Sequence, residues 1–321
     1  MSRRHILAGI VALLAAFPAV AQTFPAKPVR MVVPFAAGGP TDVMTRTFAN
    51  GFSAQLNQQV LVENRPGAGG NIAAAHVATS PADGYTLLVA GQGILAINKA
   101  LYGRINYEPE KDFAWIGMLG SLPNVLVVTP DLPAQNMQQF IELARSQPEK
   151  ISYGSNGIGS LSHLTTEVLA SAAGVKFLHV PYQGAAPQRT DLLSGRIRFS
   201  FIAASTMLPL IREGKLRALA VSTNTRLASL PGIPTLVESG YPMLDAPTWF
   251  AAVAPSATPA PVLAALRAAF AAAIAAPAYG PEMEKQSSIV VKMGPEAAEA
   301  MLARERKTWS DAVRSTGAKA E

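Results

Sequence analysis

The glycine-rich turns between predicted strands and predicted helices are the parts of this chain whose residue types and spacing suggest chemistry. The first such turn is Gly38-Gly39-Pro40-Thr41-Asp42, which follows a β-type run ending at Phe35. Backbone N–H groups in the first turn of a helix have no helical partner and lie at the positive end of the helix dipole. Glycine also lets the backbone approach a ligand closely. The pattern therefore predicts an anion-binding loop.

Two more turns have the same character, and both have a plainer interpretation. They run from Asn64 to Gly70 and from Gly154 to Ser160. Any α/β protein needs tight turns and helix caps, and Thr41 and Ser160 are ordinary N-cap residues. The second turn resembles a dinucleotide fingerprint, but Ile72 stands where that motif needs glycine or alanine, and no P-loop lysine-threonine pair occurs. Nucleotide binding is therefore not predicted.

Residue types used in catalysis do not form a recognisable constellation. The absence of cysteine excludes disulfides, thiolate zinc sites and cysteine nucleophiles. His76, His163 and His179 do not pair at metal-ligand spacing, and neither His-Glu-x-x-His nor Gly-x-Ser-x-Gly occurs. Glu167 lies four residues after His163 on one helical face, which indicates a hydrogen-bonded structural histidine, with a ligand contact as the alternative. We expect a protein that is not an enzyme and uses no metal or cofactor.

Several arginines and aromatic residues leave two interpretations open. Arg196 and Arg198 share one strand face, with Arg189 nearby, and this face is either solvated or recognises a carboxylate. Tyr182 and Trp249 are placed either to pack in the core or to form flat walls of a cleft.

The N-terminus predicts secretion. Arg3 and Arg4 precede an apolar run from Ile6 to Phe17, and small residues follow up to Ala21. This is the pattern of a Sec signal peptide over residues 1–21, cleaved near Ala21, which implies the periplasm; a buried N-terminal helix is the alternative. Cleavage takes the formal charge from +6 to +4, which suits anionic ligands. Nucleic acid is not an expected partner, because no basic run has interleaved aromatics.

Short β-type runs alternate with helical patterns, and these elements must position the turns. The alternation predicts parallel α/β sheets. One helical pattern from Leu161 to Ala172 ends before Gly174, which suits the position after a helix. The predicted strands are Val29–Phe35, Val60–Asn64, Thr86–Ala90, Val125–Thr129, Ile151–Tyr153, Phe177–Pro181, Ile197–Ile202, Leu216–Ser222 and Phe250–Ala254.

Proline, asparagine and aspartate punctuate the chain near Ser121–Asn124 and Met243–Thr248. We interpret these two places as crossings between two lobes. Lobe 1 would then be discontinuous, comprising residues 22–123 and 248–321, and lobe 2 would comprise residues 124–247.

Eight sequence motifs, taken in their order along the chain, closely resemble the Bug family. These proteins are the extracytoplasmic solute-binding receptors of tripartite tricarboxylate transporters. The resemblance covers essentially the whole mature chain and implies a two-lobed α/β periplasmic-binding-protein fold, a type II-like Venus flytrap with two interlobe crossings. The motifs are "VPFAAGGPTD", "ENRPGAGGNIAA", "ADGYTLL", "YGSNGIGSLSHLTTE", "HVPYQGAAP", "GKLRALAVSTNTR", "LPGIPTLVESGYP" and "WSDAVRSTG".

The resemblance also implies a ligand site between the lobes. A ligand carboxylate would meet the first glycine loop, and the loops of lobe 2 would face it. The ligand would be a di- or aromatic carboxylate, with aliphatic and aromatic acids both left open. The implied ligand-binding residues are Phe35, Ala36, Gly38, Gly39, Thr41, Asp42, Gly91, Gln92, Ser155, Asn156, Gly157, Gly159, Ser160, His163, Tyr182 and Gly184.

The expected function is capture of a small organic carboxylate by interlobe closure, followed by delivery to membrane permease subunits that are bound transiently. A monomer is expected. The alternatives are a receptor that presents the acid to a sensor kinase, and a periplasmic hydrolase. Many relatives have prolines where Ala36 and Ala37 stand, which should matter little if the backbone binds the ligand. Arg189 and Arg198 make lobe 2 more basic than usual, which hints at a second carboxylate on the ligand.

Overall fold

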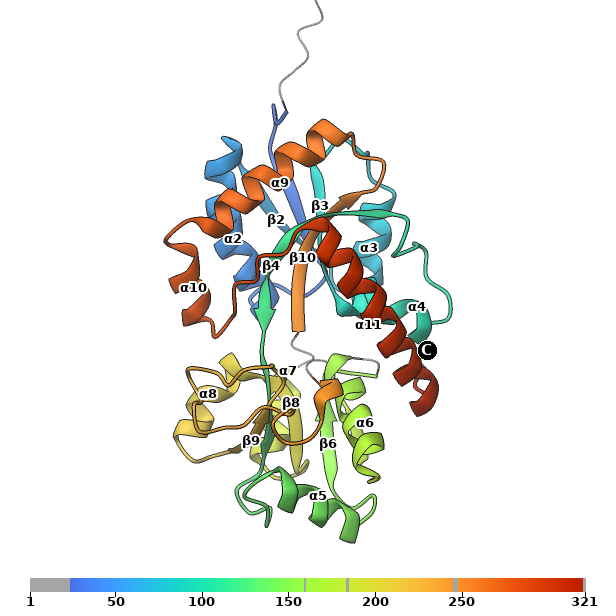
Figure 1. Ribbon diagram of the computed structural model, residues 1–321, viewed down its shortest axis with the longest axis vertical. Coiled ribbons are helices and arrows are strands. Elements are labelled where there is room, and N and C mark those ends of the chain that lie inside the picture. The colour runs from blue at the N-terminus through green and yellow to red at the C-terminus, as the bar shows by residue number, and fades with distance from the viewer. Residues whose placement is uncertain (1–23, 159, 183–184, 245–247, 320–321) are drawn as a thin grey trace, which may run out of the picture.

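Two five-stranded sheets form the framework of the protein, one in each lobe (Figure 1). The computed structural model describes residues 24–158, 160–182, 185–244 and 248–319, so the predicted signal peptide lies outside the described residues. Sheet A, in lobe 1, has the order β2 (Val60–Asn64), β1 (Val29–Val33), β3 (Thr86–Gly91), β10 (Thr248–Pro255) and β4 (Phe113–Leu122). Sheet B, in lobe 2, has the order β7 (Leu178–Pro181), β6 (Ser152–Ser155), β8 (Phe199–Ala203), β5 (Asn124–Val128) and β9 (Arg217–Val221).

Both sheets are mixed, which corrects the prediction of parallel sheets. In sheet A, β10 is antiparallel to β3 and β4, and in sheet B, β5 is antiparallel to β8 and β9. Both of these strands begin where the chain has just arrived from the other lobe. They start at the edge where their neighbours end, so they must run in the opposite direction.

Every predicted strand overlaps an observed one, but β4 was not predicted. Its segment contains Gly117 and Gly120, which in a sequence indicate a break. In the structure these glycines leave room for neighbouring helices, because a Cβ atom at Gly117 would lie 2.4 Å from the ring of Phe270.

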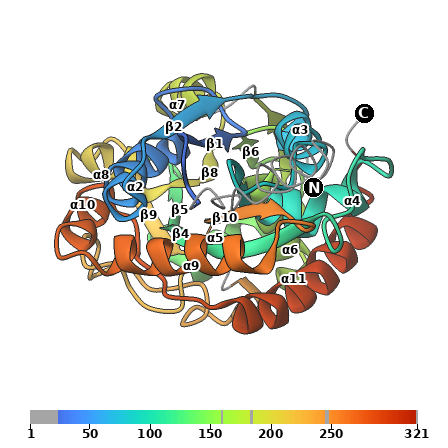
Figure 2. The same cartoon turned by 90° about the horizontal axis from the view of Figure 1, so that it is seen from above.

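Helices cover both faces of each sheet (Figures 1 and 2). Lobe 1 carries α2 (Pro40–Leu56), η1 (Ala68–Gly70), α3 (Asn71–Ala78), the π-helix η2 (Gly93–Ile97), α4 (Asn98–Leu101), α9 (Ala260–Ala275), α10 (Tyr279–Lys285) and α11 (Pro295–Thr316). Lobe 2 carries α5 (Met137–Ser146), α6 (Leu161–Ala173), α7 (Ala185–Leu193), α8 (Ala204–Arg212) and η3 (Pro242–Leu244). As predicted, α6 ends before Gly174, which has a left-handed backbone with φ 64°.

Alternating side chains of the strands pack on opposite faces of each sheet. On β1, Met31 and Val33 join the cluster beneath α2 and α9, whereas Val32 joins the cluster beneath α3 and α11. On β5, Leu126 packs towards α5 and α6, whereas Val127 packs towards α7 and α8. Each lobe therefore has a hydrophobic core on both sides of its sheet.

The chain passes between the lobes directly from β4 to β5, through Pro123. The return passage precedes β10 and includes residues 245–247, which lie outside the described residues. Near these passages the Asn124 side chain donates a hydrogen bond to Thr248 Oγ1 (2.8 Å). The residue boundaries of the lobes stay a prediction.

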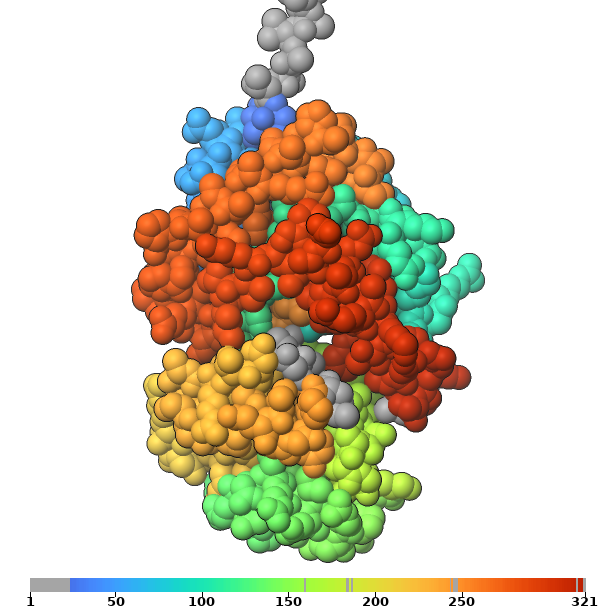
Figure 3. All heavy atoms as spheres, in the orientation of Figure 1, coloured from blue at the N-terminus to red at the C-terminus, as the bar shows by residue number. Residues whose placement is uncertain are grey.

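Helix α11 also contacts both lobes (Figures 1 and 3). Its Trp309 and Val313 are buried in one cluster with Leu101 of lobe 1 and Leu164 of α6 in lobe 2. Within the part of the chain that the structure describes, no single helix is long and apolar enough to span a membrane; α9 and α10 meet that criterion only together, across a bend of 67°.

Candidate functional site

The glycine loops lie where strands of the two lobes end towards each other. In lobe 1 the first loop follows β1, and Gln92 and Gly93 follow β3, which ends at Gly91. In lobe 2 the third glycine turn follows β6, and the segment from Tyr182 follows β7. Ligands of α/β proteins bind outside the carboxyl ends of strands, so the sheet topology brings these predicted segments to the interlobe edges.

The first loop is exposed and offers backbone donors. Residues 35–38 are exposed, and Gly39, with φ −75°, is the N-cap of α2 in place of the expected Thr41. The N–H groups of Gly39, Thr41 and Asp42 have no hydrogen-bond partner among the described residues. They belong to the first turn of a 17-residue helix, which makes this turn suitable for an anion.

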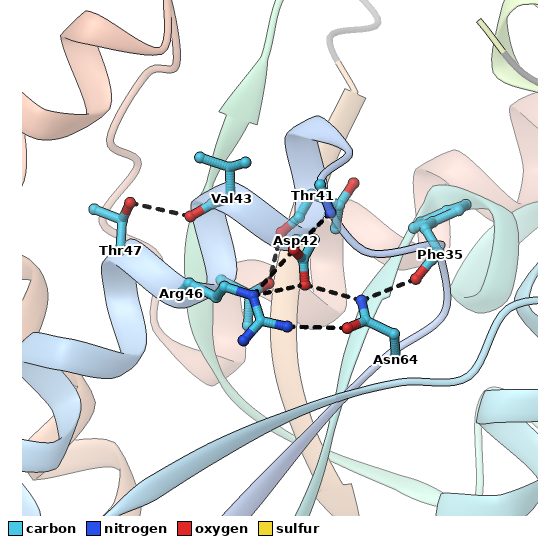
Figure 4. A network of polar contacts seen from close by, with 9 residues as sticks. Phe35, Thr41, Asp42, Val43, Arg46, Thr47 and Asn64 are labelled. Carbon is cyan, nitrogen blue, oxygen red and sulfur yellow. Dashed lines mark hydrogen bonds and ion pairs between the residues drawn. The ribbon is translucent and has the colours of Figure 1, made fainter. Parts of the chain in front are cut away.

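The conformation of this loop is set by the buried carboxylate of Asp42 (Figure 4). Asp42 Oδ2 accepts a hydrogen bond from Gly38 N–H (2.8 Å), and Asp42 Oδ1 accepts one from Asn64 Nδ2 (2.9 Å). Asn64 Nδ2 also donates to the carbonyl of Phe35 (3.0 Å). Arg46 Nε donates to Asp42 Oδ1 and Oδ2 at 3.1 and 3.0 Å. Both ends of the loop are thereby attached to one polar network.

Asp42 is ionised in this network. Burial acts to raise the pKa of its carboxyl, but hydrogen bonds from Arg46, Gly38 and Asn64 together hold that pKa below its ordinary value. Its side chain is only 3% exposed. Asp42 was predicted to bind the ligand. Its carboxylate oxygens hold the loop and occupy the N–H group of Gly38, so a ligand contact through its own N–H group stays a prediction.

Gly91 and Gln92, the predicted wall of lobe 1, are attached to the start of β10. Gln92 is 3% exposed, and its Oε1 accepts a hydrogen bond from Trp249 N–H (3.0 Å). A Cβ atom at Gly91 would lie 2.8 Å from the carbonyl oxygen of Trp249, so only glycine fits there. In this conformation both residues connect β3 to the return passage between the lobes.

In lobe 2 the third glycine turn is held by its own serine hydroxyls. The side chain of Ser162 accepts from Asn156 N–H (3.1 Å), and that of Ser155 accepts from Gly157 N–H (3.2 Å). Ser160 is the N-cap of α6, as predicted, and accepts from His163 N–H (3.4 Å). Gly159 and Gly184, also predicted at the site, lie outside the described residues.

Two stacked histidines stand behind this turn. The rings of His163 and His179 are 4.1 Å apart and inclined by 10°, and His179 Nε2 lies 2.7 Å from Ser155 Oγ. Burial lowers the pKa of each histidine to about 4, so both are neutral at pH 7. Glu167, the expected partner of His163, accepts a hydrogen bond from the hydroxyl of Tyr153 (2.5 Å).

The aromatic residues considered as cleft walls differ in exposure. Trp249 is 3% exposed and donates through Nε1 to Glu305 (2.9 Å), so it belongs to the core. The hydroxyl of Tyr182 donates to Asp191 Oδ2 (2.9 Å), and its ring packs into lobe 2. Phe35 is 41% exposed, with its ring edge-on to Phe250. Of the three, Phe35 presents an aromatic surface to solvent.

The arginines of lobe 2 do not converge on the loops. Arg198 precedes β8, at the strand end opposite the interlobe edge, and pairs with Asp131 (3.0 Å). Arg196 pairs with Asp191 (3.1 Å). This arrangement contradicts the interpretation that Arg196 and Arg198 recognise a carboxylate. Both residues precede β8, and the interlobe edge with the ligand loops lies at the other end of that strand. Arg189 is exposed on α7.

Sequence reasoning missed the residues that hold the first loop. Asn64 was noted only as the start of the second turn, and Arg46 was not singled out. One signal was present, since Asp42 and Arg46 are four residues apart on a helix. The second turn itself packs beside the loop, because a Cβ atom at Gly70 would lie 3.1 Å from Pro34 Cβ.

The described residues around the loops provide neutral hydrogen-bond donors. They include backbone N–H groups, serine hydroxyls and neutral histidines, and no group of three metal-ligating side chains occurs among the residues that the structure describes. Such donors can hold an anion by charge-assisted hydrogen bonds.

Known proteins are similar to most of this chain. A family model described as tripartite tricarboxylate transporter family receptor matches residues 44–317. Protein BugT of Bordetella pertussis is 36% identical over 305 residues, covering 95% of this chain and 94% of BugT. An R. palustris protein determined with adipate is 33% identical, with a TM-score of 0.83 over 92% of this chain and 99% of that one. MatC from Rhodopseudomonas palustris, determined with bound malate, is 30% identical, with a TM-score of 0.79 over 90% and 100%.

Proposed function

Because the chain belongs to the family of tripartite tricarboxylate transporter receptors, we propose that it is a periplasmic solute-binding protein for a small organic dicarboxylate. It acts as a monomer that captures the acid between its lobes and delivers it to the membrane subunits of a tripartite transporter.

The first glycine loop is the observation that carries this proposal. Its backbone is exposed, and its N–H groups at Gly39 and Thr41, at the start of a long helix, have no hydrogen-bond partner in the described part of the chain. The third glycine turn starts α6 on the facing edge of lobe 2. A ligand with two carboxylates can engage both edges at once.

Capture proceeds by closure. A carboxylate docks on lobe 1, accepting hydrogen bonds from the first loop, and lobe 2 then rotates about the two passages and adds its own contacts. The ligand favours closure only by its higher affinity for the closed form. Micromolar affinity corresponds to about −8 kcal/mol. A few charge-assisted hydrogen bonds and burial of the apolar part of the acid can supply this free energy.

The ligand class follows from the relatives and from the aromatic residues. Relatives 33% and 30% identical were determined with adipate and malate, which are both aliphatic dicarboxylates. An aromatic acid would need flat walls on both sides, and Trp249 is buried and unable to form one in this conformation. We therefore favour an aliphatic dicarboxylate over an aromatic one.

Native mass spectrometry of the purified protein tests the proposal first, because a co-purified acid would identify itself by mass. Thermal unfolding with mono-, di- and aromatic carboxylates then follows. A ligand at one hundred times its Kd should stabilise the protein by about 2.7 kcal/mol. Carboxamide analogues of the same size serve as controls and should give no shift. If no carboxylate in the panel raises the melting temperature, the proposal is wrong.

A further inference from the structure

The first glycine loop already contains an anion. The carboxylate of Asp42 is 3% exposed and accepts a hydrogen bond from Gly38 N–H within the loop. Under the proposed function, on which this inference rests, a second carboxylate docks on the N–H groups of Gly39 and Thr41. Two like charges at one helix start repel each other, and partial burial strengthens the repulsion. The loop can accept the ligand only if the charge of Asp42 is compensated.

Arg46 is placed to supply this compensation. It lies one turn after Asp42 on α2, and its Nε atom is 3.1 and 3.0 Å from the two carboxylate oxygens. Another nitrogen of the guanidinium donates to Asn64 Oδ1 (3.0 Å), and Asn64 Nδ2 in turn donates to Asp42 (Figure 4). Asp42 forms no other ion pair within the described part of the chain.

The side chains of Asp42 and Arg46 differ in exposure, and we therefore expect them to have different roles. The Asp42 carboxylate is 3% exposed, whereas the Arg46 side chain is 50% exposed. A half-exposed guanidinium adds little to folding stability as one member of a surface ion pair. Its charge nevertheless acts on the electrostatic potential at the loop, where the incoming ligand meets Asp42. Asn64 and Gly38 also bind Asp42, but both are neutral.

We propose that Arg46 is a positioning and charge-balancing residue of the ligand loop, which neutralises the internal carboxylate of Asp42 so that the loop accepts an external one. Arg46 does not touch the ligand in this proposal. It makes the affinity of the loop for a carboxylate depend on a residue that lies behind the binding surface.

The test uses acetate as the probe, because it is the smallest stable carboxylate that can occupy the loop. The amide resonances of Gly39 and Thr41 are followed by NMR during an acetate titration at constant ionic strength. Arg46→Gln removes the charge but keeps a hydrogen-bond donor. Like charges about 8 Å apart at an effective dielectric constant of about 20 to 40 repel enough to weaken acetate binding about 5- to 30-fold. Arg46→Lys keeps the charge and should bind within about threefold of the unaltered protein.

Acetamide and Lys27→Gln are the matched controls. Acetamide has the shape of acetate without its charge, so Arg46→Gln should leave its weak effect on the loop unchanged. Lys27 forms an ion pair with Asp83 (3.3 Å) and precedes β1, at the end of that strand away from the loop. Lys27→Gln changes the net charge by the same amount, and acetate should bind to it as to the unaltered protein.

Three results would overturn this inference. Arg46→Gln could bind acetate as well as the unaltered protein does, or it could lose acetamide and acetate effects equally, which would indicate a change of loop shape. Acetate could also leave the Gly39 and Thr41 amides unmoved in the unaltered protein. In each case the proposed function still stands if a carboxylate of the panel stabilises the unaltered protein against heat, so the two proposals fail separately.

Discussion

At the scale of single residues, different groups of one short loop have different roles in the candidate site. Asp42 uses its oxygens to hold Gly38 and Asn64, which leaves the N–H groups of Gly39 and Thr41 for a ligand. Gly38 has the left-handed φ of 79° that favours glycine, whereas Gly39 has an ordinary extended backbone. The glycine required by the loop conformation is therefore Gly38.

Gly38→Ala should weaken carboxylate binding, whereas Gly39→Ala should not change the loop conformation. A Cβ atom costs about 1–2 kcal/mol in the left-handed region, so Gly38→Ala would shift the loop to another conformation and lower the affinity about tenfold. At Gly39 a Cβ atom would meet only the carbonyl of Ala36, at 3.4 Å. Calorimetric titration with the acid identified by mass spectrometry measures both variants. If Gly39→Ala lowered the affinity more than Gly38→Ala did, the left-handed conformation of Gly38 would not be what carboxylate binding requires.

The stacked histidines should make folding stability fall in acid. The pKa of His163 is about 4 in the folded protein because of burial, below the ordinary value of 6.5. The unfolded chain therefore takes up a proton first, and stability is lost as the pH falls from about 6.5 towards 4.

His163→Phe keeps a ring against His179 but cannot be protonated. Urea unfolding at pH 7 and pH 5 should show that the stability difference between these pH values shrinks by about 1–2 kcal/mol in this variant. An unchanged difference would mean that His163 titrates normally in the folded protein.

At the scale of elements, α11 joins parts that belong to different lobes. Its Glu305 accepts a hydrogen bond from Trp249 at the start of β10, and its Trp309 packs with Leu164 of α6. The helix that follows the third glycine turn is thus in contact with a helix anchored on lobe 1. Any rotation of lobe 2 must change this contact or carry the end of α11 with it.

Glu305→Gln should stabilise the protein in alkali and leave it unchanged in acid. Burial raises the pKa of Glu305 to about 7, and this outweighs the hydrogen bond from Trp249. The folded protein keeps a proton that the unfolded chain releases above its ordinary pKa of 4.5, so stability is lost as the pH rises from about 4.5 to 7.

The amide of glutamine stays neutral, so urea unfolding at pH 8 should show a gain of about 3 kcal/mol for this variant, and almost no gain at pH 4, below the ordinary pKa. This pH dependence is opposite in sign to that of His163. If the variant and the unaltered protein were equally stable at pH 8, the Glu305 carboxylate would be well solvated in the folded protein.

At the scale of the whole molecule, two lobes with the same sheet plan are linked by two chain passages and by α11. The chain passes through Pro123, it returns before β10, and α11 bridges the lobes from the side. The hydrogen bond from Asn124 to Thr248 lies where the two passages meet their sheets. Under the proposed function, lobe 2 rotates about this region, and this rotation must alter the contact between α11 and α6.

Ligand binding should therefore make the molecule more compact. Small-angle X-ray scattering should show a smaller radius of gyration when the acid identified by mass spectrometry is added, with an inactive carboxamide as the control. Trp309→Ala should change the radius of the ligand-free protein, because it removes the largest side chain of the α11 bridge. Binding without any compaction would contradict capture by closure.

Local sequence patterns were sufficient to predict much of this fold. All described strands except β4, the Ser160 cap, the end of α6 at Gly174 and the family could be predicted from the sequence, because β-type runs, caps and glycines act on neighbouring residues. Direct sequence reasoning also located the glycine turns at strand ends.

Contacts between distant residues were decided by the tertiary structure alone. The carboxylate of Asp42, at the start of α2, is bound by Asn64 of β2, which sequence spacing does not report. Trp249 could have packed in the core or formed a cleft wall, and its hydrogen bond to Glu305, 56 residues later, places it in the core. The directions of β5 and β10, and the pairing of Arg198 with Asp131, likewise depend on how the chain passes between lobes. Sequence spacing reports which side chains share an element, but only packing decides which polar groups meet.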